Sequence, residues 1–123
     1  MRIQESAENY LETILIIKKR CGQVRAIDIV NELSFSKPSV SVAMKNLRIN
    51  GYIDVDANGN IELLEQGRLI AEKIYERHTL LTRWLTALGV NPQTAAEDAC
   101  RIEHVISEET FEALKAYAAK QSP

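Results

Sequence analysis

Three side chains that commonly bind metal ions stand close together toward the carboxyl end of the chain: Cys100, Glu103 and His104. Their spacing of i, i+3 and i+4 places them on one face of a helix, within reach of a single ion. A thiolate, a carboxylate and an imidazole together favour a transition metal over calcium or magnesium. This segment therefore predicts a metal site.

His78 is a second candidate ligand. It lies four residues after Ile74 and three before Leu81, in an apolar stripe where a hydrocarbon side chain is the usual choice. Taken alone, this position also fits a hydrogen-bonded core histidine. Because the chain has two histidines and the other stands beside Cys100 and Glu103, we interpret His78 as a ligand of the same site.

Asn9 and Glu12 form a third element, spaced i, i+3 on one face of a predicted helix. The alternative is an ordinary solvated helix face. If Glu12 were buried together with Glu103, the two carboxylates would repel each other unless a cation neutralised them. We therefore expect metal to hold the first helix against the carboxyl-terminal helices.

Periodicity and turn residues predict the elements that position these side chains. Ser6 and Ser107 are the expected caps of the first and last helices, and Ser36 with Pro38 is expected to begin the third. Helices are predicted over residues 6–20, 26–33, 36–50, 67–88, 93–103 and 107–119, and short strands over 52–55 and 61–64. This order predicts a mainly α chain, with a winged helix-turn-helix DNA-binding domain at residues 1–64 and an all-helical metal-binding and dimerisation domain at 65–123.

The third predicted helix has the composition of a DNA-reading helix. From Phe35 to Gly51 every charged residue is basic. If Val40 and Met44 face inward, Val42 faces outward, where it fits contact with a thymine methyl. The alternatives are a merely solvated helix or a protein-binding winged helix. The predicted DNA-binding residues are Arg25, Ser36, Lys37, Pro38, Ser39, Ser41, Val42, Lys45 and Arg48.

Bulk properties narrow the function classes. The 123 residues exclude a large multidomain enzyme, and the net charge of −2 is not that of a strongly basic nucleic-acid binder. No apolar run approaches the roughly 20 residues of a membrane span. The amino terminus resembles no signal or transit peptide, so we expect a cytoplasmic protein with no membrane partner and no small organic substrate.

A homodimer is expected from the amount of apolar surface on the carboxyl-terminal helices. The helix from Ile70 to Leu88, together with Phe111, Leu114 and Tyr117, carries more apolar side chains than a small monomer readily covers. The alternative is that they form an intramolecular core.

At its candidate metal ligands and in its first and third predicted helices, the chain resembles the diphtheria-toxin-repressor family of iron- and manganese-dependent repressors. The resemblance covers nearly the whole chain and is most specific at Asp98 to Ser107. Further matching segments are Glu8 to Glu12, Ser36 to Ser41, and Arg77-His78.

The resemblance implies a repressor of metal-uptake genes that binds a double-stranded DNA operator as a homodimer when Mn²⁺ or Fe²⁺ is bound. Co²⁺, Ni²⁺ or Zn²⁺ are expected substitutes. By position, Cys100, Glu103, His104 and His78 match family ligands, and Glu12 matches a ligand of the manganese branch, which is also short.

Several positions depart from the family pattern. Asn9 stands where relatives place aspartate or methionine, although an amide oxygen can bind a hard cation. Cys100 is similar to the iron branch, so the identity of the metal stays open. Thr82 and Ala96 replace ligands of the iron branch's ancillary site, and Val42 replaces a polar DNA contact of some relatives.

Two other functions remain as alternatives. A thiol-redox regulator would use Cys100 or Cys21 as its sensor thiolate. A metallohydrolase would use the same donors with a bound water, but the sequence offers no independent general base, so we expect no enzyme.

Overall fold

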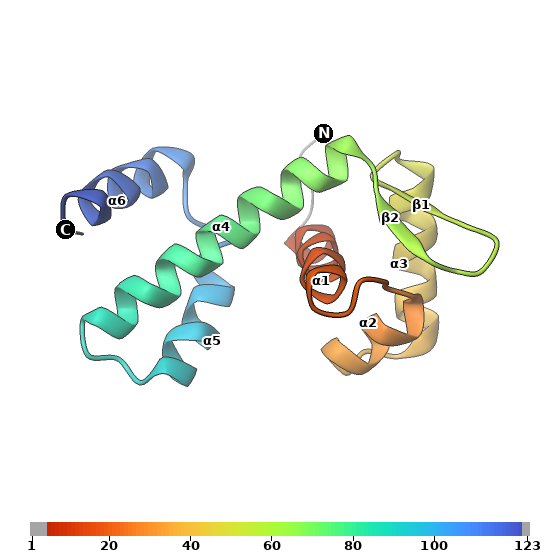
Figure 1. The fold of residues 1–123 in the computed structure, drawn as a ribbon, viewed down its shortest axis with the longest axis horizontal. Helices are drawn as coiled ribbons and strands as arrows, with labels where there is room; N and C mark the ends of the chain where they lie inside the picture. The colour runs from red at the N-terminus through yellow and green to blue at the C-terminus, as the bar shows by residue number, and fades with distance from the viewer. Residues whose placement is uncertain (1–4, 122–123) are drawn as a thin grey trace. The chain divides into compact units, whose positions relative to one another are not determined.

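The computed structural model describes residues 5–121, which form helices and one two-stranded antiparallel sheet (Figure 1). The chain divides into two compact units, Met1–Lys73 and Ile74–Pro123, and the longest helix contributes to both. The elements are α1 (Glu5–Cys21), α2 (Ala26–Leu33), α3 (Lys37–Ile49), β1 (Ile53–Val55), β2 (Ile61–Leu63), α4 (Glu65–Ala87), α5 (Pro92–Ile102) and α6 (Glu108–Gln121).

The amino-terminal unit has the predicted winged helix-turn-helix architecture. Helix α1 buries Leu11 and Ile14 completely, and it packs against α2 and α3. Helix α2 contributes the buried Ile29, while Val40 of α3 closes the same core. These residues recur at helical spacing, so each helix presents one apolar stripe to the others.

Helices α2 and α3 are joined by a short turn in which Ser34 adopts a left-handed conformation (φ 58°). Ser36 then caps α3, because its Oγ accepts a hydrogen bond from the amide of Ser39 (3.2 Å). The Ser36 cap of α3 and the bounds predicted for α2 are both confirmed. The expected cap Ser6 is wrong, since the helix already includes Glu5.

The wing is the hairpin β1–β2, with Ile53 opposite Leu63 and Val55 opposite Ile61. Its base lies against the start of α4 at Gly67. A Cβ on Gly67 would lie 2.1 Å from the carbonyl oxygen of Tyr52, so this close approach requires glycine.

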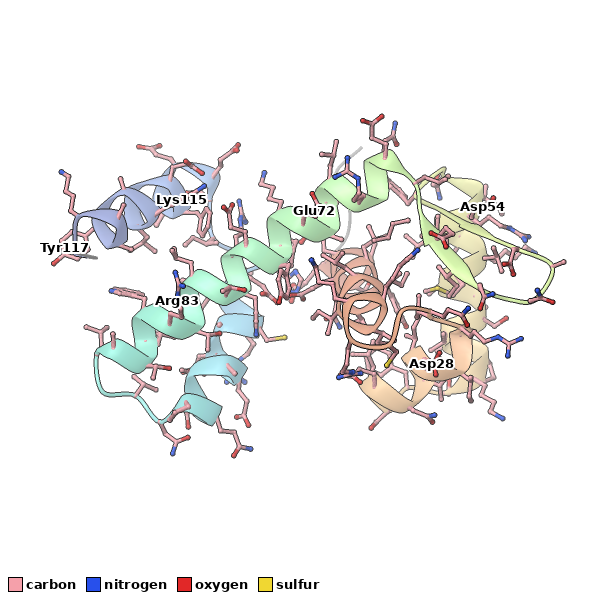
Figure 2. The ribbon with its side chains drawn as sticks, viewed as in Figure 1. Asp28, Asp54, Glu72, Arg83, Lys115 and Tyr117 are labelled. Atoms are coloured by element: carbon pink, nitrogen blue, oxygen red, sulfur yellow. The ribbon has the colours of Figure 1, made fainter. Side chains whose placement is uncertain are left out.

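The carboxyl-terminal unit comprises the later turns of α4 with α5 and α6. Its buried side chains include Ile74 and Leu81 of α4 and Phe111 of α6. An ion pair between Lys115, labelled in Figure 2, and Glu76 (2.9 Å) also joins α6 to α4. Helix α4 ends at Ala87, one residue before its predicted end, and Leu88 is 64% exposed.

Within residues 5–121, every helix is too short or too polar to cross a membrane.

Candidate metal centre and nucleic-acid interface

Glu103 and His104 lie in a turn that follows α5. Helix α5 ends at Ile102, and the amides of Val105 and Ile106 both donate to the Ile102 carbonyl (3.0 and 2.9 Å). Glu103 is the C-cap of this helix, since its amide still donates to the Ala99 carbonyl (2.9 Å), and the shared ligand role of Cys100, Glu103 and His104 stays a prediction. The helix therefore ends at the second donor, and the turn carries the third.

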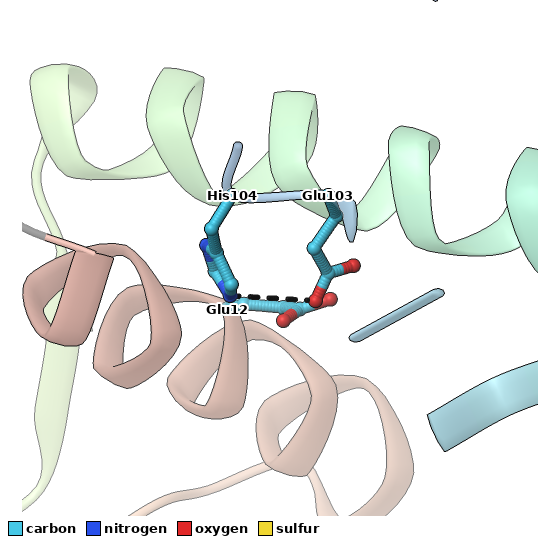
Figure 3. A group of neighbouring side chains, drawn as sticks. All are labelled: Glu12, Glu103 and His104. Carbon is cyan, nitrogen blue, oxygen red and sulfur yellow. Dashed lines mark ion pairs between the residues drawn. The ribbon is translucent and has the colours of Figure 1, made fainter. Parts of the chain in front are cut away.

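The Glu103 carboxylate is the central group of this part of the structure. It is completely buried, and its two oxygens face two different imidazoles. Oε2 lies 3.1 Å from Nδ1 of His78 on α4. Oε1 lies 3.5 Å from Nε2 of His104, and this ion pair is drawn in Figure 3. Two predicted ligands, His78 and His104, which are 26 residues apart in the chain, thus lie beside the same carboxylate.

Neither carboxylate oxygen of Glu103 accepts a hydrogen bond from the described residues. A buried carboxylate without hydrogen-bond donors is unfavourable unless a positive charge compensates it. A divalent ion supplies that charge, and a donor set of imidazole nitrogens with a carboxylate oxygen suits a first-row transition metal. The residues present therefore fit a metal centre.

The remaining predicted metal donors are placed as follows. Cys100 lies in the last turn of α5 with an exposed side chain. Asn9 and Glu12 lie on α1 in the amino-terminal unit. Asn9 is half-buried, while Glu12 is 3% exposed, so the alternative of a solvated helix face is wrong for Glu12. The ligand roles of all three stay predictions.

The predicted DNA-reading residues of α3 form an exposed surface. Ser36, Lys37, Pro38, Ser39, Ser41, Val42, Lys45 and Arg48 are all exposed. Val42 is 59% exposed, while Val40 and Met44 are buried as expected. Ser41, Met44, Lys45, Arg48 and Val55 line a shallow hollow of about 280 Å³. A surface that is basic, serine-rich and apolar in part fits phosphate and base contacts.

Arg25, a further predicted DNA contact, is tied to the wing. Its guanidinium donates a hydrogen bond to the carbonyl of Asn58 in the hairpin turn. Its own amide donates to the Asp28 carboxylate (2.9 Å) at the start of α2. Arg25 therefore joins the first turn of α2 to the wing, a role that the sequence did not indicate.

Arg77 is a second residue whose role the sequence did not predict. It is 7% exposed and donates hydrogen bonds to the main chain of the turn that carries Glu103. A signal was present, because Arg77 stands in the stripe formed by Ile74 and Leu81, where a charged residue needs a partner.

Comparison with known families matches both parts of the chain. Residues 2–60 match the family described as iron dependent repressor, N-terminal DNA binding domain. Residues 64–121 match the iron dependent repressor, metal binding and dimerisation domain.

Individual relatives agree with these matches. The transcriptional regulator MntR of Escherichia coli O6:H1 is 32% identical over 117 residues, which cover 95% of this chain and 76% of that protein. An uncharacterized HTH-type transcriptional regulator of Methanocaldococcus jannaschii is 32% identical over 120 residues, 96% of each chain. The structure of the manganese regulator SloR matches 97% of this chain with a TM-score of 0.80 and 25% identity, but the match spans 55% of that longer chain.

Proposed function

Because this chain belongs to the iron-dependent repressor family, we propose that it represses genes of metal uptake or metal homeostasis when a divalent ion is bound. Residues 1–64 bind an operator in double-stranded DNA, and residues 65–123 bind metal and form a homodimer. The observation that carries the proposal is the buried Glu103 carboxylate, which lacks hydrogen-bond donors among the described residues and faces two histidines.

The ion is held by the side chains that surround Glu103. His78, Glu103 and His104 supply two nitrogens and a carboxylate, and we assign Cys100, Asn9 and Glu12 as further donors from the family resemblance. Glu12 is 3% exposed, and its ligand role rests on that resemblance. The bound ion supplies a positive charge beside the buried Glu103 carboxylate and stabilises the positions of the donors that it binds.

We propose Mn²⁺ or Fe²⁺ as the physiological ion. The likeness to the manganese regulator SloR supports Mn²⁺. The thiol of Cys100 supports a softer ion such as Fe²⁺. Co²⁺, Ni²⁺ and Zn²⁺ substitute, because nitrogen, oxygen and sulfur sites bind these ions at least as tightly and select mainly by geometry and availability.

Operator binding is assigned to α3 and its neighbours. The exposed Lys45 and Arg48 meet phosphates, while the first turn with Ser36 to Ser41 meets base edges. In a symmetric homodimer two such helices enter major grooves about one helical turn apart. Metal binding favours the spacing of the two α3 helices that fits both half-sites. We assign the repressor to the cytoplasm.

Selection of DNA by the purified protein tests this function. A pool of random duplexes is selected in Mn²⁺, and the enriched duplex is titrated by fluorescence anisotropy in Mn²⁺, Fe²⁺, Co²⁺, Zn²⁺ or chelator. We expect metal to raise the affinity about 5- to 150-fold, the usual range of coupling between two sites. Equal affinity with metal and with chelator, or no enrichment of any duplex, would overturn the proposal.

A further inference from the structure

Arg77 is a buried arginine that binds main-chain oxygens beside an aromatic ring. Its Nη1 donates to the carbonyls of Glu103 (3.1 Å) and Ile106 (2.9 Å). The guanidinium carbon lies 5.5 Å from the centre of the Phe111 ring, which is itself buried. Two carbonyl dipoles and the ring face together compensate part of the cost of burying this cation.

The two carbonyls mark the beginning and the end of the turn that follows α5. No regular helix extends through this turn, since α5 ends at Ile102 and α6 begins at Glu108. A turn between helices would ordinarily be among the less rigid parts of a domain. Here one side chain from α4 holds both of its ends.

We propose that Arg77 is a positioning residue for the metal centre, acting through the main chain of Glu103. Adjacent residues of α4 hold different parts of the same glutamate. Arg77 binds its carbonyl, and His78 lies 3.1 Å from its carboxylate. The direction of the carboxylate is thereby fixed before an ion arrives, which lowers the ordering cost of binding.

The inference rests on the proposed function, because it assigns Arg77 to the support of the same site. Outer residues that orient metal ligands typically contribute about 10- to 100-fold in metal affinity. Lysine keeps the charge but lacks the guanidinium group that reaches both carbonyls. Methionine keeps an apolar stem of similar length and removes both donors.

Hydrogen exchange in the metal-free protein tests the positioning role directly. The amides of Val105 and Ile106 report the turn, since both donate to the Ile102 carbonyl. In Arg77→Met we expect them to exchange about tenfold faster or more, with a smaller increase in Arg77→Lys. The matched control is Arg68→Met, which removes an exposed arginine of the same helix that pairs with Glu72.

Cobalt binding tests the consequence for the site. Co²⁺ is titrated into each variant and followed by its visible absorption, which reports both affinity and ligand geometry. We expect Arg77→Met to bind Co²⁺ about 10- to 100-fold more weakly than the wild type. Arg77→Lys should be intermediate, and Arg68→Met should match the wild type.

The outcomes separate this inference from the proposed function. If the wild type binds neither Co²⁺ nor Mn²⁺, the proposed function fails. If the wild type binds Co²⁺ and both Arg77 variants bind it equally well, this inference alone is overturned. Unchanged exchange at Val105 and Ile106 in both variants also overturns it. Should Arg77→Met fail to fold, Arg77→Lys decides by the same two measurements.

Discussion

At the scale of single residues, Glu103 combines a cost with a function. Its carboxylate is fully buried, and it faces imidazole nitrogens of His78 and His104 that offset a negative charge only when protonated. A bound cation removes this cost, whereas the metal-free protein retains it. Glu103 is thus expected to favour the metal-bound protein and to lower the stability of the metal-free one.

Replacing Glu103 by glutamine tests this balance. The amide has nearly the same shape but no charge, so at pH 8 without metal we expect Glu103→Gln to be more stable than the wild type by about 1 kcal/mol. With Mn²⁺ present the order reverses, because a ligand has been lost. The measurement is urea unfolding of both proteins in Mn²⁺ and in chelator.

The matched control is Glu76→Gln, which neutralises an exposed carboxylate of α4 that pairs with Lys115. Its stability should change little, because exposed ion pairs typically contribute about 0–1 kcal/mol, and Mn²⁺ should stabilise it as it does the wild type. A Glu103→Gln protein that is still stabilised by Mn²⁺ to the wild-type extent would remove Glu103 from the site.

The sequence indicated His78, Glu103 and His104 because such donors are few and their spacing is informative. The predicted end of this helix, at residue 103, lies one residue beyond the observed end at Ile102. The end of the helix is accompanied by hydrogen bonds from Arg77, a partner 26 residues away from Glu103. The position of Arg77 in an apolar stripe indicates that it needs a partner, but which groups it binds depends on tertiary packing.

At the scale of elements, the wing is stabilised by its own turn. The Asp56 carboxylate accepts hydrogen bonds from the amides of Asn58 (2.8 Å) and Asn60 (2.9 Å). The bond from the Asn60 amide is the main cause that lowers the pKa of Asp56 below its ordinary value of 3.8. Such bonds favour the charged carboxylate in the folded state.

A pH dependence of the wing follows. Because the folded pKa of Asp56 lies below the unfolded one, its contribution to stability is complete above the unfolded value and is lost as pH falls through the folded value. The titration of the Asp56 carboxyl carbon by NMR should therefore have its midpoint below pH 3.8. A midpoint at or above that value would show that the turn bonds do not form in solution.

Most elements were predictable because their signals are local. The bounds of α2 and the Ser36 cap agree with the prediction, and the strands agree within one residue at each end. These depend on neighbouring turn and capping residues. The link from Arg25 to Asn58 was not predictable, because it joins residues that only the folded hairpin brings together.

At the scale of the whole molecule, four of the proposed metal ligands lie outside the proposed DNA-binding domain, while Asn9 and Glu12 lie within residues 1–64. The exposed cations of α3 are separate in sequence from His78, Glu103 and His104. Regulation therefore requires that metal binding at these three side chains change the affinity of α3 for DNA. Allosteric coupling of this kind is reciprocal by thermodynamic necessity.

Lys45→Ala tests the separation of roles. We expect weaker binding to every DNA sequence. The slope of the logarithm of affinity against the logarithm of salt concentration should become shallower by about 0.9 for each phosphate that the protein no longer neutralises. The affinity for Mn²⁺ in the absence of DNA should not change. Lys120→Ala removes an exposed cation of α6 and is the control. An equal decrease of DNA affinity in both variants would point to a non-specific charge effect rather than to α3.

The most direct test of metal-controlled repression measures the coupling from both directions. Operator affinity is determined by anisotropy with saturating Mn²⁺ and with chelator, and Mn²⁺ affinity is determined by electron paramagnetic resonance with and without saturating operator. We predict that Mn²⁺ raises the operator affinity and that operator raises the Mn²⁺ affinity by the same factor. An operator affinity that is the same in Mn²⁺ and in chelator would contradict the proposed function at its centre.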